Sequence, residues 1–195
     1  MNINRFRIVV LAVLALLMVG LSSCHSSRLA QGRDDIYGDN VGGRRPDRNK
    51  GDVVRRDGDG KAFDKGSIHA SGKARGVIDA AYDWLGVPYL YGGNSPSGTD
   101  CSGLVCMAFE KGAGMKLPRS SREQAKYSHS ISLDKIEPGD LVFFVSRAGG
   151  DRINHVAIYI GDNSIIHATT SRGVAITRLD DNYWRSHYWG CGRVL

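Results

Sequence analysis

The stretch "NHVAIYIGDNSIIHA", residues 154–168, predicts the β-hairpin that decides the fold of the second half of the chain. Two runs of β-branched and aromatic residues flank the turn "GDNS", in which Gly and Asn accept positive φ angles. Side chains alternate between the faces of a strand, so His155 shares a face with Ala157 and Tyr159. The hairpin can place His167 on that same face of the next strand.

Three other segments of the second half are also predicted to be strands, because they are short, rich in β-branched or aromatic residues, and separated by turn signals. They are residues 140–146, 173–179 and 187–195. The first half instead shows helical periodicity. Helices followed by strands predict the α+β class, in which the helices pack on an antiparallel sheet of five or six strands.

The first predicted helix covers residues 74–86, "ARGVIDAAYDWLG", with Gly86 as its C-cap. Pro88 prevents its continuation. A second helix follows the loop "YLYGGNSPSGT", and its stop signals are Gly112 and Gly114. The motif "SSRE", residues 120–123, predicts a capping box for a short third helix. We assign the tryptophans to packing.

Cys101 stands at the predicted start of the second helix, with Asp100 as the N-cap. The positive end of a helix stabilises a thiolate, so this is a favourable place for a reactive cysteine. We expect the helix to pack on the hairpin face that carries both histidines. His155 would then be the base that takes the thiol proton, and His167 would orient the imidazole by accepting a hydrogen bond.

Other functions remain open for the same three residues. A cysteine and two histidines can bind zinc, with water as the fourth ligand, although the close ligand spacing of common zinc sites is absent. A thioester on the cysteine can also pass its acyl group to an amine, which would make the protein an acyltransferase or amidase. A catalytically silent wall-binding protein is a further alternative.

Residues 73–195 resemble the NlpC-type cell-wall peptidases, a family of papain-like cysteine peptidases. The matching motifs follow one another in order along nearly the whole segment: "GVPYLYGG", "GTDCSGLV", "LPRSSREQ", "EPGDLVFF", "NHVAIYIG" and "IIHA". The resemblance implies a murein endopeptidase that hydrolyses amide bonds in peptidoglycan stem peptides or crosslinks. It implies a thioester acyl-enzyme and requires no metal or cofactor.

The resemblance also assigns roles to individual residues. Cys101 corresponds to the nucleophile, His155 to the general base, and His167 to the third, orienting residue. Tyr89 corresponds to the tyrosine that helps to bind the oxyanion. The positions implied to contact substrate, or in the case of the arginine to contact substrate or support the structure, are Asp100, Ser102 and Arg119.

The N-terminus resembles the signal peptide of a bacterial lipoprotein. Two arginines precede the apolar run at residues 8–21, and "LSSC" resembles a lipobox that ends at Cys24. We expect cleavage after residue 23 and lipid on Cys24, which would anchor the protein to a membrane facing the periplasm. His25 replaces the aspartate associated with inner-membrane retention, which favours the outer membrane.

Residues 24–72 are predicted to form a disordered polar tether, because they contain almost no large apolar residues. The formal net charge is +6, but no dense basic patch with interleaved aromatics appears, so nucleic acid is not an expected partner. We expect a monomer. Cys106 and Cys191 are left as either a disulfide or two buried thiols, and the apolar helical surroundings of Cys106 favour thiols.

Overall fold

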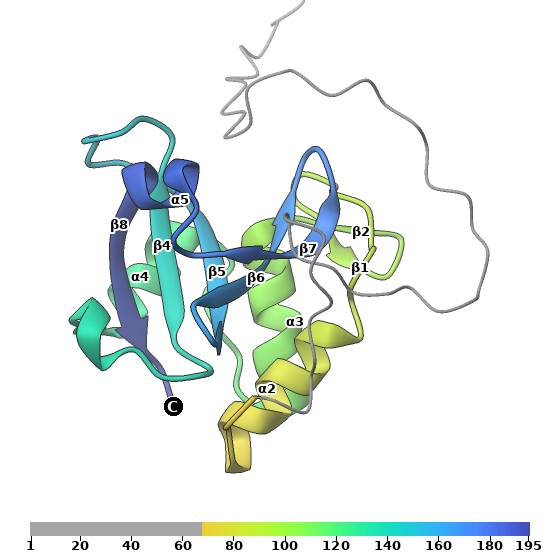
Figure 1. Cartoon of the computed structure of the whole chain (residues 1–195). Coiled ribbons are helices and arrows are strands. Elements are labelled where there is room, and N and C mark those ends of the chain that lie inside the picture. Colours follow the sequence, from red (N-terminus) through yellow and green to blue (C-terminus); the bar gives the residue numbers. More distant parts are fainter. Residues whose placement is uncertain (1–67) are drawn as a thin grey trace, which may run out of the picture. The chain divides into compact units, whose positions relative to one another are not determined.

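A computed structural model describes residues 68–195 of the chain (Figure 1). The predicted signal peptide, Cys24 and most of the predicted tether lie outside these residues. None of the helices within 68–195 combines the length and the apolar character needed to cross a bilayer. In chain order the elements are α2 (Gly72–Tyr82), β1 (Asn94–Ser95), β2 (Gly98–Thr99), α3 (Cys101–Ala113), α4 (Ser121–Tyr127), β3 (His129–Ile131), the 3₁₀ helix η2 (Leu133–Lys135), β4 (Leu141–Val145), β5 (Ile153–Gly161), β6 (Ser164–Thr169), β7 (Gly173–Arg178), α5 (Asn182–His187) and β8 (Tyr188–Arg193).

The larger of the two sheets has six strands in the order β3-β8-β4-β5-β6-β7, and every neighbouring pair is antiparallel. The smaller sheet is the β1–β2 hairpin within the loop before α3. The α+β class is therefore confirmed, and the predicted strands are all present. Sequence analysis did not predict β3, a three-residue strand that pairs with β8 at the edge of the sheet.

The predicted hairpin is formed by β5 and β6, with positive φ angles at Gly161 (92°) and Asn163 (53°) in its turn. Pairing between the two strands ends at Ile158 and Ile166. Both strands continue beyond that point on their other sides, where β5 still pairs with β4 and β6 with β7. The strands β5 and β6 therefore part before the hairpin reaches His155.

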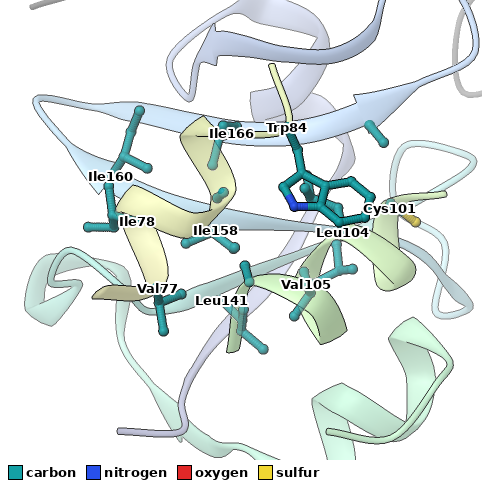
Figure 2. Packing of buried hydrophobic residues seen from close by; sticks show 14 of the residues in the cluster. Val77, Ile78, Trp84, Cys101, Leu104, Val105, Leu141, Ile158, Ile160 and Ile166 are labelled. Atoms are coloured by element: carbon teal, nitrogen blue, oxygen red, sulfur yellow. The ribbon is translucent and has the colours of Figure 1, made fainter. Parts of the chain in front are cut away.

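Two separate hydrophobic clusters cover the two faces of this sheet. The larger one joins α2 and α3 to Val156, Ile158 and Ile160 of β5 (Figure 2). The smaller one contains Ala157 and Trp184 and lies on the face that carries His155. Our prediction that α3 packs on the histidine face was therefore wrong. The helices need a continuous aliphatic surface, and only the opposite face of β5 offers one.

Several boundaries also differ from those predicted. The helix α2 ends at Tyr82, and the chain turns tightly until Gly86, whose N–H donates to Val174 O at 2.9 Å. Gly112 lies inside α3, where a Cβ would be 2.3 Å from the backbone of Gly76 on α2. Gly112 therefore permits close helix packing, while Gly114 is the left-handed C-cap that we predicted.

The compact fold begins earlier than the domain boundary placed at residue 73. Ile68, which the sequence analysis assigned to the tether, is buried in the larger cluster. Ala70 packs against the same cluster. The last residues of the predicted tether thus belong structurally to the domain.

Candidate active site

The start of α3 is fixed by its N-cap, as predicted. The N–H of Gly103 donates to Asp100 Oδ1 at 2.7 Å. Gly103 also lets the preceding loop approach the helix, because a Cβ there would lie 2.2 Å from Gly93 O. Tyr89 forms a parallel bridge with Thr99, immediately before the cap. The loop and the first helical turn therefore hold Tyr89 and Cys101 close in the fold.

The carboxylate of Asp100 is the centre of a hydrogen-bonded network, which we call the aspartate network. Its Oδ1 accepts from Ser102 Oγ at 3.2 Å and from Arg119 Nη1 at 2.9 Å, in addition to the capping bond. Its Oδ2 accepts from Gly92 N at 2.8 Å and from Arg119 Nη2 at 2.9 Å. The structure thus joins Asp100, Ser102 and Arg119 to one another. Their contact with substrate stays a prediction.

The thiol of Cys101 lies at the edge of the larger cluster (Figure 2) and is 8% exposed. The backbone N–H of Val156 lies near its sulfur and acts to lower the pKa of the thiol. Successive N–H groups of a strand point alternately to its two sides. The N–H of Tyr159 bonds to Asp140 O, on the side of β4. The N–H of Val156 therefore points to the β6 side, where β6 has already separated. The sulfur meets β5 one residue from His155.

Burial, and after it the negative charge of Asp100, raises the pKa of the Cys101 thiol to about 11. The backbone N–H groups of Val156, Ser102 and Cys101 itself act in the opposite direction. The stabilisation expected from the helix end is therefore present, but desolvation outweighs it. The resting thiol is protonated at neutral pH.

The hairpin brings the two predicted histidines together. His155 Nε2 and His167 Nδ1 are 3.0 Å apart and share a hydrogen bond. Burial lowers the pKa of His155 to about 3. It also lowers the pKa of His167 well below the ordinary value, and the nearby His155 and Arg172 add to that effect. Both imidazoles are therefore neutral at neutral pH.

The bond between the histidines leaves Nδ1 as the nitrogen of His155 that can take a proton from the thiol. Within residues 68–195, no hydrogen bond joins Cys101 to His155 in this resting state. Catalytic hydrogen bonds are commonly long before substrate binds. The N–H that acts on the sulfur belongs to Val156, the next residue along β5, so the thiol lies near the part of the strand that carries His155.

Sequence analysis missed the involvement of Trp184 in this site, since it assigned the tryptophans only to packing. Its ring stacks on His155 with 5.3 Å between centroids and meets the edge of His167 at 4.6 Å. Trp184 belongs to α5, whose N-cap Asp181 accepts from Tyr183 N at 2.9 Å. The signal available in the sequence was this capping aspartate before an aromatic pair.

Thr177 is a second residue of the site that the sequence analysis missed. Its Oγ1 lies 2.9 Å from His167 Nε2 and accepts from Arg172 Nη2 at 3.1 Å. The register between β6 and β7 pairs His167 with Ala175, so Thr177 is the diagonal neighbour on the same face. The alternation of side chains along β7 predicts which face Thr177 occupies, but its position beside His167 depends on the register between β6 and β7.

The other two described cysteines are free thiols, of which Cys191 is buried and Cys106 is half-buried rather than buried as the thiol alternative expected. Cys106 Sγ contacts Pro118 O at 3.4 Å, and Cys191 Sγ contacts Tyr188 Oη at 2.9 Å. In the part of the chain that the structure describes, no group of three or more His, Cys, Asp or Glu side chains is placed to hold a metal ion.

Comparison with known proteins identifies the family. Residues 86–193, more than half of the chain, match the model of the NlpC/P60 family. The site defined by Cys101 and the histidine pair lies within this match. The chain therefore belongs to the NlpC/P60 family.

Individual relatives show what is shared. "Murein DD-endopeptidase MepS/Murein LD-carboxypeptidase" of Escherichia coli (strain K12) is 44% identical over 119 residues, which are 61% of this chain and 62% of that protein. The match thus spans less than two thirds of its length. A crystal structure of an NlpC/P60 family protein from Bacillus cereus has a TM-score of 0.59 at 32% identity, covering 66% of this chain and 42% of that one. The fold expected from the resemblance is confirmed.

A third relative shows that the fold alone does not determine activity. RipD from Mycobacterium tuberculosis, described as a non-catalytic NlpC/p60 domain protein adapted to peptidoglycan binding, has a TM-score of 0.54 at 26% identity. The similarity covers 65% of this chain and 100% of that one. Whether a member is an enzyme therefore has to be argued from the residues of its site.

Proposed function

We propose that this protein is a lipid-anchored cysteine peptidase that hydrolyses amide bonds in peptidoglycan peptides. The observation that carries the proposal is the arrangement of Cys101 against the strand that holds His155, with His155 bonded through Nε2 to His167. A nucleophile, a base and a group that orients the base are the minimum for thiol-based acyl transfer. The murein endopeptidase activity in the name of the E. coli relative supports the same substrate class.

In the first half of the reaction, His155 Nδ1 takes the proton of the Cys101 thiol while the sulfur attacks the amide carbonyl carbon. The developing oxyanion is stabilised by backbone N–H groups at the start of α3 and by Tyr89. The imidazolium of His155 then gives its proton to the amide nitrogen, the C–N bond breaks, and the amine leaves. The product at this point is a thioester on Cys101.

In the second half, His155 takes a proton from a water molecule, and the oxygen of that water attacks the thioester carbon. The C–S bond breaks, the free carboxyl product leaves, and the proton returns to the sulfur. Burial keeps the thiol and the imidazole neutral at rest. The thiolate therefore forms only together with the attack, which avoids a buried ion pair in the resting enzyme.

The test is digestion of purified sacculi by the full-length protein in detergent, with mass spectrometry of the released fragments. We expect fragments from the native protein and none from Cys101→Ala or Cys101→Ser. Chelator treatment should leave the activity intact, because the mechanism uses no metal. Full activity of Cys101→Ala, or restoration of a chelated sample by zinc alone, would overturn the proposal.

The same spectra identify the bond that is cut. Cleavage after D-Glu in the stem peptide, cleavage of the crosslink to D-Ala, and release of a terminal residue give fragments of different mass. Transfer of the acyl group to an amine would instead give a product heavier than the hydrolysed one. Hydrolysis products without such adducts are the expected result.

The lipid anchor has a separate test, because it depends only on the N-terminal resemblance. We expect native protein in the membrane fraction of cells, and the outer membrane after gradient separation. Cys24→Ala should release the protein from membranes, or leave it with an uncleaved signal peptide. Normal processing and full outer-membrane attachment of Cys24→Ala would show that the lipobox hypothesis is wrong.

A further inference from the structure

We infer that Thr177 is a positioning residue that sets the tautomer of the His155–His167 pair and so determines which nitrogen of His155 faces the thiol without a proton. The inference rests on the proposed function, because it assumes that His155 Nδ1 is the base. It concerns a residue outside the three that the family resemblance assigns to catalysis.

The three side chains form one hydrogen-bonded chain across three adjacent strands. His155 on β5 contacts His167 on β6 at 3.0 Å, and His167 contacts Thr177 on β7 at 2.9 Å. All three are buried, with 4%, 0% and 4% of their surface exposed, respectively. Bulk water is therefore a poor substitute for any member of this chain.

The positions of the protons along the chain depend on one another. A neutral imidazole has one N–H and one acceptor nitrogen. If His155 Nδ1 is to accept the thiol proton, His155 carries its own proton on Nε2 and donates it to His167 Nδ1. His167 then carries its proton on Nε2 and requires an acceptor there. The only group that the structure places at hydrogen-bond distance from that nitrogen, among residues 68–195, is Thr177 Oγ1.

The opposite arrangement would disable the base. There, the Thr177 hydroxyl donates to His167 Nε2, His167 donates through Nδ1 to His155 Nε2, and His155 presents an N–H to the thiol. Arg172 donates to the same threonine oxygen and occupies one of its acceptor positions. One lone pair remains, which is the position that the His167 N–H needs in the active arrangement.

Loss of the Thr177 hydroxyl should therefore change the position of the His167 proton much more than it changes the packing. Without it, the buried N–H on His167 Nε2 would lose its acceptor, whereas an unprotonated Nε2 would leave only an acceptor unsatisfied. The pair would shift towards the inactive tautomer. Valine has nearly the shape of threonine but has no hydroxyl, so Thr177→Val separates these effects.

A matched control is available on the neighbouring strand. Thr169 ends β6, is 5% exposed, and uses its hydroxyl for contacts with the backbone of Gly173 and Arg172. Thr169→Val removes the same group from a threonine of similar burial that does not contact either histidine. Comparison of the two variants separates the loss of a buried hydroxyl from the loss of the histidine acceptor.

The first measurement is steady-state hydrolysis of a soluble muropeptide by the full-length variants in detergent. We expect Thr177→Val to lower kcat about ten-fold, the effect of losing one buried hydrogen bond, with KM unchanged. Thr177→Ser should recover most of kcat, and Thr169→Val should stay within about two-fold of the native value. Native kcat in Thr177→Val, or equal losses in both valine variants, would contradict the inference.

The second measurement needs no substrate and is therefore independent of the proposed function. Nitrogen NMR of protein labelled in its histidine rings distinguishes protonated from unprotonated ring nitrogens. In the native protein we expect His155 protonated on Nε2 and unprotonated on Nδ1, and in Thr177→Val an increase in the reverse tautomer. An Nδ1–H on native His155, or unchanged tautomers in Thr177→Val, would overturn the inference even if the native protein digests sacculi.

Discussion

Two hydrogen-bonded systems flank the thiol of Cys101, and they are built in opposite ways. The aspartate network is charged, and the carboxylate of Asp100 accepts five hydrogen bonds. The histidine chain after it, formed by His155, His167 and Thr177, is neutral and has a single bond at each junction. The first system is redundant and the second is not.

This difference suits the two systems to different tasks. The aspartate network is suited to holding the thiol in place, and the histidine chain to moving its proton. Several donors on one carboxylate fix the loop and the start of α3, and the loss of one bond leaves the others. A chain with one bond per nitrogen can exchange proton positions along its length, which a multiply bonded carboxylate cannot do. We therefore expect damage to the aspartate network to lower stability and damage to the histidine chain to lower turnover.

The largest expected effect is the loss of turnover in His155→Ala. Removal of a general base typically costs about 10²- to 10⁴-fold in rate. We expect a loss in that range, measured as kcat on a soluble muropeptide, together with some loss of stability in urea, because His155 is buried and its truncation leaves a cavity beside Trp184. If His155→Ala and Arg119→Ala lower kcat equally, the division between the two systems is wrong.

The next largest effect is the loss of stability in Arg119→Ala, which leaves the buried carboxylate of Asp100 without its charged partner. A fully buried pair broken in this way costs several kcal/mol, but the Arg119 side chain is 40% exposed. We therefore expect about 2 kcal/mol in urea unfolding. Arg119→Lys should recover only part of it, because an ammonium cannot bond both oxygens as the guanidinium does. Full recovery by lysine would show that charge alone matters.

The smallest expected effect is the change in the free energy of unfolding per pH unit. The pKa of His155 is about 3 in the folded state and 6.5 in the reference state. Between these values the unfolded state binds the proton and the folded state does not, so stability falls as the pH falls below 6.5. Each such histidine contributes up to about 1.4 kcal/mol per pH unit. Urea unfolding between pH 7 and pH 5 measures the slope.

A matched variant isolates this contribution. His155→Asn should reduce the slope by about one histidine's share. An equal slope in the native protein and in His155→Asn would show that the folded state already accepts the proton. The Asp100 carboxylate would then be the nearby charge to examine, since it favours the protonated form of His155.

Much of the fold followed from local periodicity. Alternation in residues 154–168 predicted that His155 and His167 share a face, and the caps Asp100 and Ser120 were recognised from residue type and spacing. These features depend on a few neighbouring residues. A short sequence therefore contains enough information to specify them.

The missed features depend on non-local contacts. The short strand β3 is stabilised by pairing with β8, and Trp184 reaches the histidines only because α5 folds back over the sheet. The role of Thr177 requires the register between β6 and β7. The face chosen by α3 was mispredicted because chemistry suggested the histidine side, while packing favoured the aliphatic side.

The early separation of β5 from β6 has a consequence for how this site tolerates change. The N–H of Val156 lies near the sulfur, and His155, the proposed base, is the preceding residue on the same strand. A small displacement of β5 therefore moves Val156 and His155 together, because the two residues are adjacent on one strand. Substitutions in the turn at Gly161 lie at the other end of β5 and leave the spacing between Val156 and His155 unchanged.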